Sequence, residues 1–426
     1  MSGGRLDMTV LPSENVGAIR RHLLDLWNLA PRNIDLRLLC KGRILQDSDL
    51  AGELPHHEVL CVRRKRTTFE SLEIETSGDH EDLYIDGLVL AANGKIFSAH
   101  GGAGLSVVID PAKSLAKELS PTTAGLRKYA TGGVRGRNGK IYFAPCSAGR
   151  VMVIDPEECV VDMVGPEILG AAKYAAAGIL GPDGKIYFAP SFADGVLVIE
   201  PERDHVEMRI LGILGQRKYA AGGVIGPNGK IYFAPSYAEH VLVIDPQASA
   251  MELLGPELRG KRKYAATGVL APNGRIYFAP YCADQVMVID PEACTVEMLG
   301  HVMTAQRKYA AGGVLGHDGK IYFAPCSAGR VLVVDPKTST VELLGPELLG
   351  KRKYKAAGVL APNGRIYFAP SGAGLILVVD PDSSTVEMLG PQIRGDCTYP
   401  ADGVVAQDGK MYFAPWLGRH ALVIDP

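Results

Sequence analysis

Residues 219–255, which read YAAGGVIGPNGKIYFAPSYAEHVLVIDPQASAMELLG, decide the fold. Turn-forming residues separate four short runs that favour strands: GGVIG, KIYFA, VLVID and AMELL. The runs IYFA and VLVID are apolar on both faces, so we expect a small sheet that is covered on both sides. Asp-Pro ends the third run, because proline cannot donate a hydrogen bond to a neighbouring strand.

The segment GKIYFAP, or a near copy of it, recurs at a constant interval of 45 residues. Asn-Gly or Asp-Gly precedes each copy, and this dipeptide predicts a hairpin with a type I′ turn between the first two strands. Eight such units cover residues 67–426 and leave 66 residues before them. The first apolar residue of each copy is Ile96, Ile141, Ile186, Ile231, Ile276, Ile321, Ile366 or Met411.

Four-stranded units in such an array predict a mainly β fold, an eight-bladed β-propeller, with a linear β-solenoid as the alternative. Glycine and alanine are frequent in the first strand, where we expect the eight innermost strands to converge. The last unit stops at Pro426 after its third strand. FESLEI, residues 69–74, is the predicted replacement for the missing fourth strand, and it would close the ring and hide two sheet edges.

The repeat resembles those of YVTN-type and gluconolactonase-like propellers, whose strands read approximately xIYVAxxxxxxVxVIDP. The resemblance covers residues 67–426 and implies the fold but not an activity. Lactonase-type members hold a metal ion with several carboxylates and an asparagine on their inner strands. In this chain only Asp86 and Asp402 stand out as matching carboxylates.

Residues 1–66 have a different pattern, which predicts a small α+β domain. MTVLP reads as a short strand, Ser13 is a candidate N-cap, and a helical stripe and two further strand-like stretches follow. The helical stripe consists of Val16, Ile19, Leu23 and Leu26.

The motifs PSENV, RLLCKGRILQDSDL and VLCVRR resemble the ubiquitin-like (β-grasp) fold, with a first strand that is missing or very short. The resemblance places Leu39 and Val62 on the family's hydrophobic recognition patch, and Arg43 at a commonly modified lysine. No Gly-Gly terminus follows, so the resemblance implies a docking module rather than a conjugated modifier. A folded decoration without a specific partner is the alternative.

Two positions of the repeat stand out in the connection from each fourth strand to the next unit, and we call the residues at one such position across all units a column. Tyrosine occurs in every copy, which indicates a packing or hydrogen-bonding residue. Lysine precedes it in six copies and is a candidate ligand-binding residue, because like charges that face the axis would attract an anion. The alternative is that these lysines point outward into solvent. The six are Lys128, Lys173, Lys218, Lys263, Lys308 and Lys353.

The repeat changes beside the expected ring closure. Asp402, and Asp86 as its near equivalent, are candidate metal ligands, and calcium is the cation that they suit. Other departures from the repeat are candidate ligand- or partner-binding residues, although drift of the terminal repeats is the alternative. They are His100, Trp416, Arg419 and His420.

Composition excludes several classes of protein. The chain has 45 Lys and Arg against 47 Asp and Glu, which lacks the basic excess of a nucleic-acid binder. No apolar run reaches the ~18 residues of a membrane span, and the eight cysteines follow no disulfide or zinc pattern. We predict a cytoplasmic monomer with reduced thiols and no cofactor.

These features predict a non-enzymatic binding scaffold. Its propeller would recognise a protein or an anionic partner through the loops of one face, and the ubiquitin-like domain would serve for docking. Two alternatives remain: a metal-dependent hydrolase similar to the lactonases, which would use Asp86 and Asp402, and a lectin-like glycan binder.

Overall fold

The computed structural model divides the chain into two compact units, Met1–Thr68 with Pro426, and Phe69–Asp425. The units are described separately below. The described residues are 16, 18, 19, 21, 23, 34–40, 43–44, 59–65, 67–76, 87–99, 106–119, 128–129, 132–210, 212–393, 399–416 and 419–426.

Six sheets of the second unit each contain four antiparallel strands in chain order. Their apolar second and third strands are buried, as the sequence pattern predicts. The first sheet has β9 (Val134–Arg135), β10 (Ile141–Phe143), β11 (Val151–Asp155) and β12 (Val160–Val164). The second has β13 (Ile179–Leu180), β14 (Ile186–Phe188), β15 (Gly195–Glu200) and β16 (His205–Ile210). The third has β17 (Val224–Ile225), β18 (Ile231–Phe233), β19 (Val241–Asp245) and β20 (Ala250–Leu254).

The fourth sheet has β21 (Val269–Leu270), β22 (Ile276–Phe278), β23 (Val286–Asp290) and β24 (Thr295–Leu299). The fifth has β25 (Val314–Leu315), β26 (Ile321–Phe323), β27 (Val331–Asp335) and β28 (Thr340–Leu344). The sixth has β29 (Val359–Leu360), β30 (Ile366–Phe368), β31 (Ile376–Asp380) and β32 (Thr385–Leu389). Two short 3-10 helices, η2 (Pro111–Lys113) and η3 (Pro201–Arg203), lie in turns of this unit.

One larger sheet brings the two ends of the second unit together. It has eight strands in the order β33-β34-β35-β4-β8-β7-β6-β5. The FESLEI segment lies in β4, beside β35, and β4 also pairs in parallel with β8, where Ile74 stands opposite Ala116. This parallel pairing was not predicted. The strands are β33 (Val404–Val405), β34 (Met411–Phe413), β35 (His420–Asp425), β4 (Thr68–Glu75), β8 (Leu115–Leu119), β7 (Ser106–Asp110), β6 (Ile96–Ser98) and β5 (Val89–Leu90).

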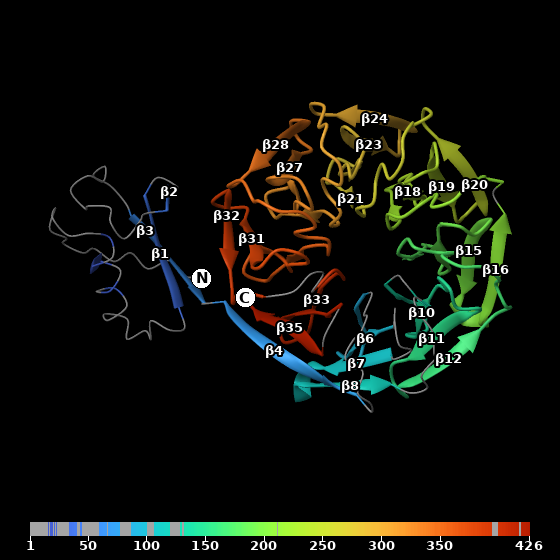
Figure 1. Ribbon diagram of the computed structural model, residues 1–426, viewed down its shortest axis with the longest axis horizontal. Coiled ribbons are helices and arrows are strands. Elements are labelled where there is room, and N and C mark those ends of the chain that lie inside the picture. Colours follow the sequence, from blue (N-terminus) through green and yellow to red (C-terminus); the bar gives the residue numbers. More distant parts are fainter. Residues whose placement is uncertain are drawn as a thin grey trace. The chain divides into compact units, whose positions relative to one another are not determined.

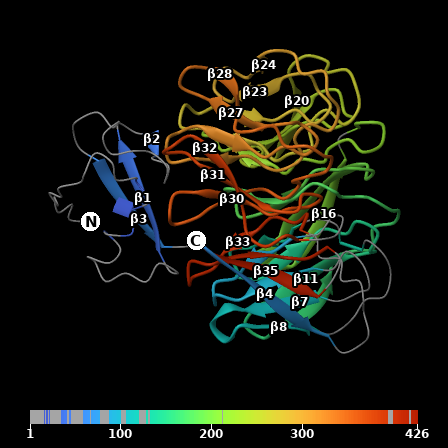
Figure 2. The ribbon, with the colours of Figure 1, turned by 60° about the vertical axis from the view of Figure 1, so that its left-hand side comes forward.

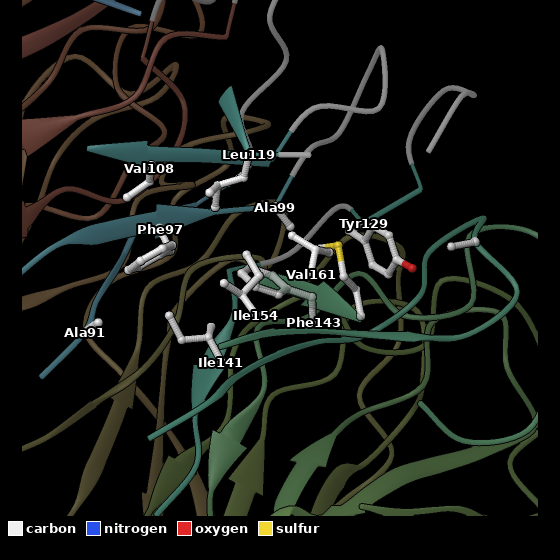
Figure 3. Close-up of a cluster of buried hydrophobic side chains, with 12 residues drawn as sticks. Ala91, Phe97, Ala99, Val108, Leu119, Tyr129, Ile141, Phe143, Ile154 and Val161 are labelled. Atoms are coloured by element: carbon white, nitrogen blue, oxygen red, sulfur yellow. The ribbon is translucent and has the colours of Figure 1, made fainter. Parts of the chain in front are cut away.

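Hydrophobic clusters join each sheet of the second unit to the next. One cluster combines Phe97 and Leu119 from the larger sheet with Ile141, Phe143 and Ile154 from β10 and β11 (Figure 3). Further clusters repeat this arrangement from sheet to sheet until the last returns to β34 and β35. The sheets therefore follow one another around a ring (Figure 1), and a second view keeps the same order (Figure 2). The fold is mainly β and propeller-like.

The hairpin between the first and second strands differs from the predicted type I′ turn. Gly229 is left-handed, with φ +75°, whereas Asn228 is not. The Gly229 N–H donates to the Gly226 carbonyl at 3.0 Å, and Gly226 N–H donates to the Lys230 carbonyl at 2.9 Å. This is a type I turn followed by a glycine bulge. Asn228 also donates from Nδ2 to the Pro291 carbonyl of the next sheet at 3.0 Å, so the turn residue joins neighbouring sheets.

Glycine in the first strand has a different cause from the expected convergence at the axis. A Cβ on Gly358 would lie 2.5 Å from Cε1 of Phe368, in the second strand of the same sheet. Phe143 and Phe278, at the equivalent positions of their sheets, exclude a side chain at Gly133 and Gly268. The need for glycine at this column therefore arises within each sheet.

The first unit contains a sheet of three antiparallel strands in the order β2-β1-β3. They are β1 (Ile34–Cys40), β2 (Arg43–Ile44) and β3 (Val59–Lys65). Residues 16, 18, 19, 21 and 23 are helical, and Val16 and Leu23 are buried. Leu39 stands opposite Leu60, and Val62 stands opposite Arg37. The strand that we expected at 8–12 lies outside the described residues.

Candidate functional site on the loop face

Two kinds of loop lie together on one face of the second unit, which we call the loop face. They are the connections between second and third strands and those from a fourth strand to the next sheet. The Cys146 N–H donates to the Lys128 carbonyl at 2.7 Å, and the Lys173 N–H donates to the Cys146 carbonyl at 3.0 Å. The Ser191 N–H then donates to the Lys173 carbonyl at 2.8 Å, so each lysine joins two successive loops.

Five of the six predicted lysines are buried, with side chains only 2–3% exposed: Lys173, Lys218, Lys263, Lys308 and Lys353. Lys218 Nζ donates to the Gly215 carbonyl at 2.9 Å, and Lys263 Nζ donates to the Gly260 carbonyl at 3.0 Å. Lys128 is partly buried. The alternative that these lysines point outward into solvent is wrong for the five buried side chains, because their amines end on backbone carbonyls.

Burial lowers the pKa of all five of these ammonium groups. Asp194 acts in the opposite direction on the pKa of Lys218, and Glu239 does so on that of Lys263. The hydrogen-bond partners of the amines are neutral carbonyls, so these contacts satisfy the donors without cancelling their charge. Positive charge therefore lies directly beneath the surface of the loop face.

The repeated tyrosine is a packing and hydrogen-bonding residue, as predicted. Tyr264 is buried, and its hydroxyl donates to the Gln285 carbonyl at 3.3 Å and contacts Met298 Sδ at 3.4 Å. Tyr174, Tyr219, Tyr309 and Tyr354 likewise donate to the carbonyl 21 residues later. Burial raises the pKa of these phenols well above the usual value of 10.

Four arginines precede buried lysines in an unusual backbone conformation. Arg217, Arg262, Arg307 and Arg352 have φ between +53° and +56°, where residues other than glycine and asparagine are uncommon. Arg217, Arg307 and Arg352 are exposed, and Arg262 is half-buried. These arginines were not predicted as site residues. The signal for them was the recurrent Arg-Lys-Tyr triplet.

Two tyrosines of the loop face lie among these arginines. Arg262 Nε donates to Tyr237 Oη at 3.2 Å, and hydrogen bonds from Arg262 and Arg217 lower the pKa of Tyr237. Burial raises the pKa of Tyr281, and the nearby charges of Arg307 and Arg262 act against that rise.

The opposite face, which we call the turn face, carries the hairpin turns and the turns between third and fourth strands. Charge differs strongly between the two faces. Over the six four-stranded sheets, the loop-face segments contain 15 Lys and Arg against 6 Asp and Glu. The turn-face segments of the same sheets contain 9 against 14. The loop-face segments are 144–150, 165–176, 189–194, 212–221, 234–240, 255–266, 279–285, 300–311, 324–330, 345–356, 369–375 and the described residues 390–393. The turn-face segments are 136–140, 155–159, 181–185, 200–204, 226–230, 245–249, 271–275, 290–294, 316–320, 335–339, 361–365 and 380–384.

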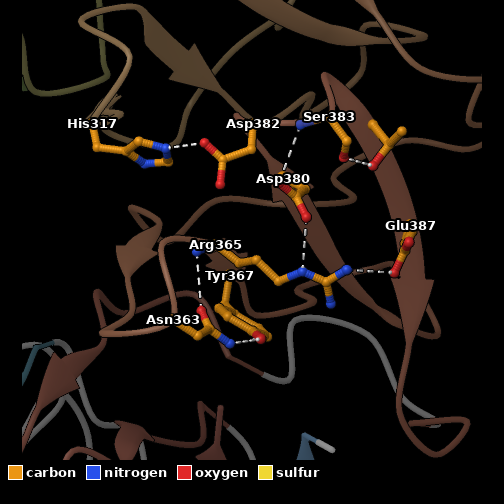
Figure 4. A network of polar contacts seen from close by, with 9 residues as sticks. His317, Asn363, Arg365, Tyr367, Asp380, Asp382, Ser383 and Glu387 are labelled. Atoms are coloured by element: carbon orange, nitrogen blue, oxygen red, sulfur yellow. Dashed lines mark hydrogen bonds and ion pairs between the residues drawn. The ribbon is translucent and has the colours of Figure 1, made fainter. Parts of the chain in front are cut away.

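Six of the nine basic side chains counted on the turn face are paired with carboxylates. Arg365 lies 3.2 Å from Asp380 and 3.4 Å from Glu387 in a largely buried network (Figure 4). Lys185 and Glu200 form an equivalent pair at 2.6 Å. By contrast, no described carboxylate lies within 4.0 Å of the guanidinium groups of Arg217, Arg262 and Arg307, which remain available to a partner.

Asp402 lies in the column of residues where the first strands of neighbouring sheets approach each other. Its Oδ1 accepts a hydrogen bond of 2.5 Å from the Ala357 N–H, and Thr267 Oγ1 accepts one of 3.2 Å from the Gly222 N–H in the equivalent place. The Asp402 side chain is exposed to water, yet the surrounding protein raises the pKa of its carboxyl.

The other predicted residues near the closure are only partly described. Asp86 and His100 lie outside the described residues. Trp416 and Arg419 are half-buried, and His420 is exposed, with its carbonyl accepting a hydrogen bond from the Tyr399 hydroxyl at 3.3 Å. The described residues contain no cluster of three His, Cys, Asp or Glu suited to a metal ion. The calcium site stays a prediction.

Five cysteines whose side chains the structure describes form no disulfide with one another: Cys146, Cys159, Cys282, Cys294 and Cys326. Burial raises the pKa of the Cys326 thiol. Within the described part of the chain, no helix has the length and apolar character needed to cross a membrane.

Comparison with known proteins supports the fold. No protein family and no curated protein matches the sequence. Among solved structures, Sqt1 of Saccharomyces cerevisiae is similar with a TM-score of 0.59 at 12% identity, covering 83% of this chain and 99% of Sqt1. Streptogramin B lyase has a TM-score of 0.54 at 15% identity, covering 84% of this chain and 97% of the lyase. Virginiamycin B lyase of Staphylococcus aureus, solved with quinupristin, has a TM-score of 0.54 at 13% identity, covering 85% of this chain and all of the lyase. These are propeller-like proteins, and at such identity the likeness shows the fold alone.

Proposed function

We propose that the chain is a non-enzymatic binding scaffold that recognises a protein or an anionic partner with its loop face. The observation that carries this proposal is the separation of charge, 15 basic against 6 acidic residues on the loop face and 9 against 14 on the turn face. A local excess of one charge steers and selects partners of the opposite charge even where the net charge is close to zero. The hydrogen bonds that join successive loops favour a rigid platform.

We also propose that the platform is an eight-bladed propeller, with the eight-stranded sheet counted as two blades. The strand order supports this count, because β33-β34-β35-β4 and β5-β6-β7-β8 each have the length of one four-stranded sheet. The contacts of β4 support closure of the ring by the amino-terminal strand, because the N–H of Ile74 in β4 donates to the Arg419 carbonyl at 2.7 Å.

Residues 1–66 are proposed as a ubiquitin-like docking module. The sheet order β2-β1-β3 and the helical residues around Val16 and Leu23 support this interpretation. Leu39 and Val62, the candidate patch residues, stand on the paired strands β1 and β3, and Arg43 begins β2.

The test is partner capture by the full chain with exposed loop-face charges reversed. Lys261→Glu together with Lys351→Glu changes exposed residues and leaves the buried lysines intact. We expect this variant to lose the captured partner, whereas the matched turn-face variant, Arg137→Glu with Lys337→Glu, keeps it. Equal recovery by both variants would exclude recognition by the loop face. Reversal at Lys218 or Lys263 is unsuitable, because a buried carboxylate there would destabilise the fold.

The metal-dependent hydrolase is the second candidate, and the exposed side chain of Asp402, whose carboxylate could bind a cation, favours it. Calorimetric titration of the full chain with calcium tests this function. Heat of binding and a raised melting temperature that Asp402→Asn removes would support it, and no response would count against it. Glycan-array screening tests the lectin-like alternative in the same way.

A further inference from the structure

Five residues of the loop face form what we call the arginine–tyrosine strip: Arg217, Tyr237, Arg262, Tyr281 and Arg307. The three arginines follow β16, β20 and β24, and the two tyrosines lie in the loops after β18 and β22. Arg262 Nε donates to Tyr237 Oη at 3.2 Å, and the Tyr237 N–H donates to the Arg217 carbonyl at 3.3 Å. The Tyr281 N–H donates to the Lys263 carbonyl at 2.9 Å and the Lys308 N–H donates to the Tyr281 carbonyl at 2.8 Å, so Tyr281 lies between the residues that follow Arg262 and Arg307. Cation and aromatic ring therefore alternate across three successive sheets.

The strip carries positive charge that its surroundings do not neutralise at contact distance. Among described residues, the three guanidinium groups have no carboxylate within 4.0 Å. The buried ammonium groups of Lys218, Lys263 and Lys308 lie in the adjacent positions of the chain and end on backbone carbonyls. Asp194, Glu239 and Asp284 offset these lysines only through space.

The backbone adds a second observation. Each arginine of the strip adopts φ between +53° and +56°, a conformation that costs an arginine about 1 kcal/mol and a glycine almost nothing. Tyrosine with its hydroxyl held by arginine presents a fixed, partly apolar surface between the charges. Such a row suits an extended chain whose side chains alternate between acidic and apolar groups.

We propose that the arginine–tyrosine strip binds an extended acidic peptide segment of a protein partner. Carboxylates of the segment pair with Arg217, Arg262 and Arg307, and its intervening side chains pack on Tyr237 and Tyr281. This inference rests on the proposed recognition by the loop face. A peptide fits better than a nucleic acid, because the basic excess is confined to one face of a chain with net charge -2.

The test measures fluorescence anisotropy of a labelled 12-residue peptide of alternating Glu and Leu, titrated with the full chain. We expect saturable binding that weakens as salt rises from 50 to 200 mM. Arg217→Asn and Arg307→Asn remove one charge each, and asparagine tolerates the left-handed backbone. Each should weaken binding about fivefold, which is about 1 kcal/mol at 1.4 kcal/mol per tenfold change.

Two control variants each remove one positive charge elsewhere. Arg352→Asn changes the same backbone position outside the strip, and Lys337→Asn removes a charge from the turn face. We expect the dissociation constant of both to stay within about twofold of the unchanged chain. A melting temperature measured for each variant separates lost binding from lost folding.

Three results would overturn the proposal. The first is unchanged peptide binding by the variant that carries both Arg217→Asn and Arg307→Asn. The second is equal binding of a peptide in which Lys replaces Glu. The third is tighter binding of a single-stranded oligonucleotide with the same charge as the peptide. If peptide binding is abolished only by Lys261→Glu with Lys351→Glu, the arginine–tyrosine strip is not the binding site. The proposal that the loop face recognises the partner would then still hold. Partner capture that survives those loop-face reversals would instead overturn the proposed function itself.

Discussion

The carboxylate of Asp402 accepts a hydrogen bond from the backbone N–H of Ala357, the residue that holds the same place one repeat earlier. The equivalent residue of most other repeats is glycine or alanine, which offers no acceptor. Thr267 is the described exception, and it accepts from Gly222 in the same way. The backbone geometry of the repeat therefore allows this hydrogen bond at more than one position. The negative charge of Asp402 occurs only in this repeat among the described residues of the column.

Asp402→Asn should stabilise the chain at neutral pH, because asparagine keeps the acceptor and removes a charge that its surroundings disfavour. The folded state raises the pKa of this carboxyl. Its contribution to stability is thus fully present below the unfolded pKa near 3.9, and it is lost as pH rises through the folded pKa. In EDTA, we expect a higher melting temperature for the variant at pH 7 and no difference at pH 3.5. A variant that melts lower at pH 7 would contradict this account.

Gly358→Ala should destabilise the fold, because its Cβ would lie 2.5 Å from the Phe368 ring. Overpacking of this kind costs about 1–3 kcal/mol. Gly132→Ala is the matched control, since a Cβ there meets nothing within 4 Å, and we expect a change below about 0.5 kcal/mol. Urea denaturation of both variants measures the two free energies of unfolding. Equal values would show that the phenylalanine does not set the requirement for glycine.

The tyrosine column predicts loss of stability in alkali. Burial raises the pKa of Tyr174, Tyr219, Tyr264, Tyr309 and Tyr354 above the value of 10 in an unfolded chain. The stability that this shift provides is present below pH 10 and is lost as pH rises further. We expect absorbance at 295 nm and far-ultraviolet circular dichroism to change together above pH 10. Tyrosine ionisation that precedes any loss of strand signal would mean that the phenols are accessible in the folded chain.

Most of the fold could be predicted because its determinants are local. The 45-residue period, the apolar second and third strands and the Asp-Pro stops all act within one unit, and they recur in the sheets as expected. The turn type was wrong, because Gly229 forms a bulge that lengthens the loop beyond the two residues of a type I′ hairpin. The parallel pairing of β4 with β8 was missed, because no pattern within one strand encodes its partner.

The candidate site was less predictable, because side-chain direction depends on backbone conformation. Lys263 is buried since Arg262 before it is left-handed, and the pair reads in sequence as two equivalent surface cations. The separation of charge could have been predicted from the sequence, because it requires only assigning each loop or turn to one face and counting its charged residues. The net charge of -2 gives no sign of this separation, because the opposite charges of the two faces offset each other.

Ile74→Ala tests whether β4 holds the second unit together. Ile74 is 1% exposed and packs with Ile96, Val107 and Val423 from the strands on both sides of β4. Truncation of a buried isoleucine leaves a cavity and costs about 2–5 kcal/mol. Glu73→Ala, at the adjacent exposed position, is the control and should change stability little. If β4 joins β35 to β8 in solution, thermal unfolding of Ile74→Ala should remain a single transition at lower temperature. A variant as stable as Glu73→Ala would mean that the ring holds without this strand.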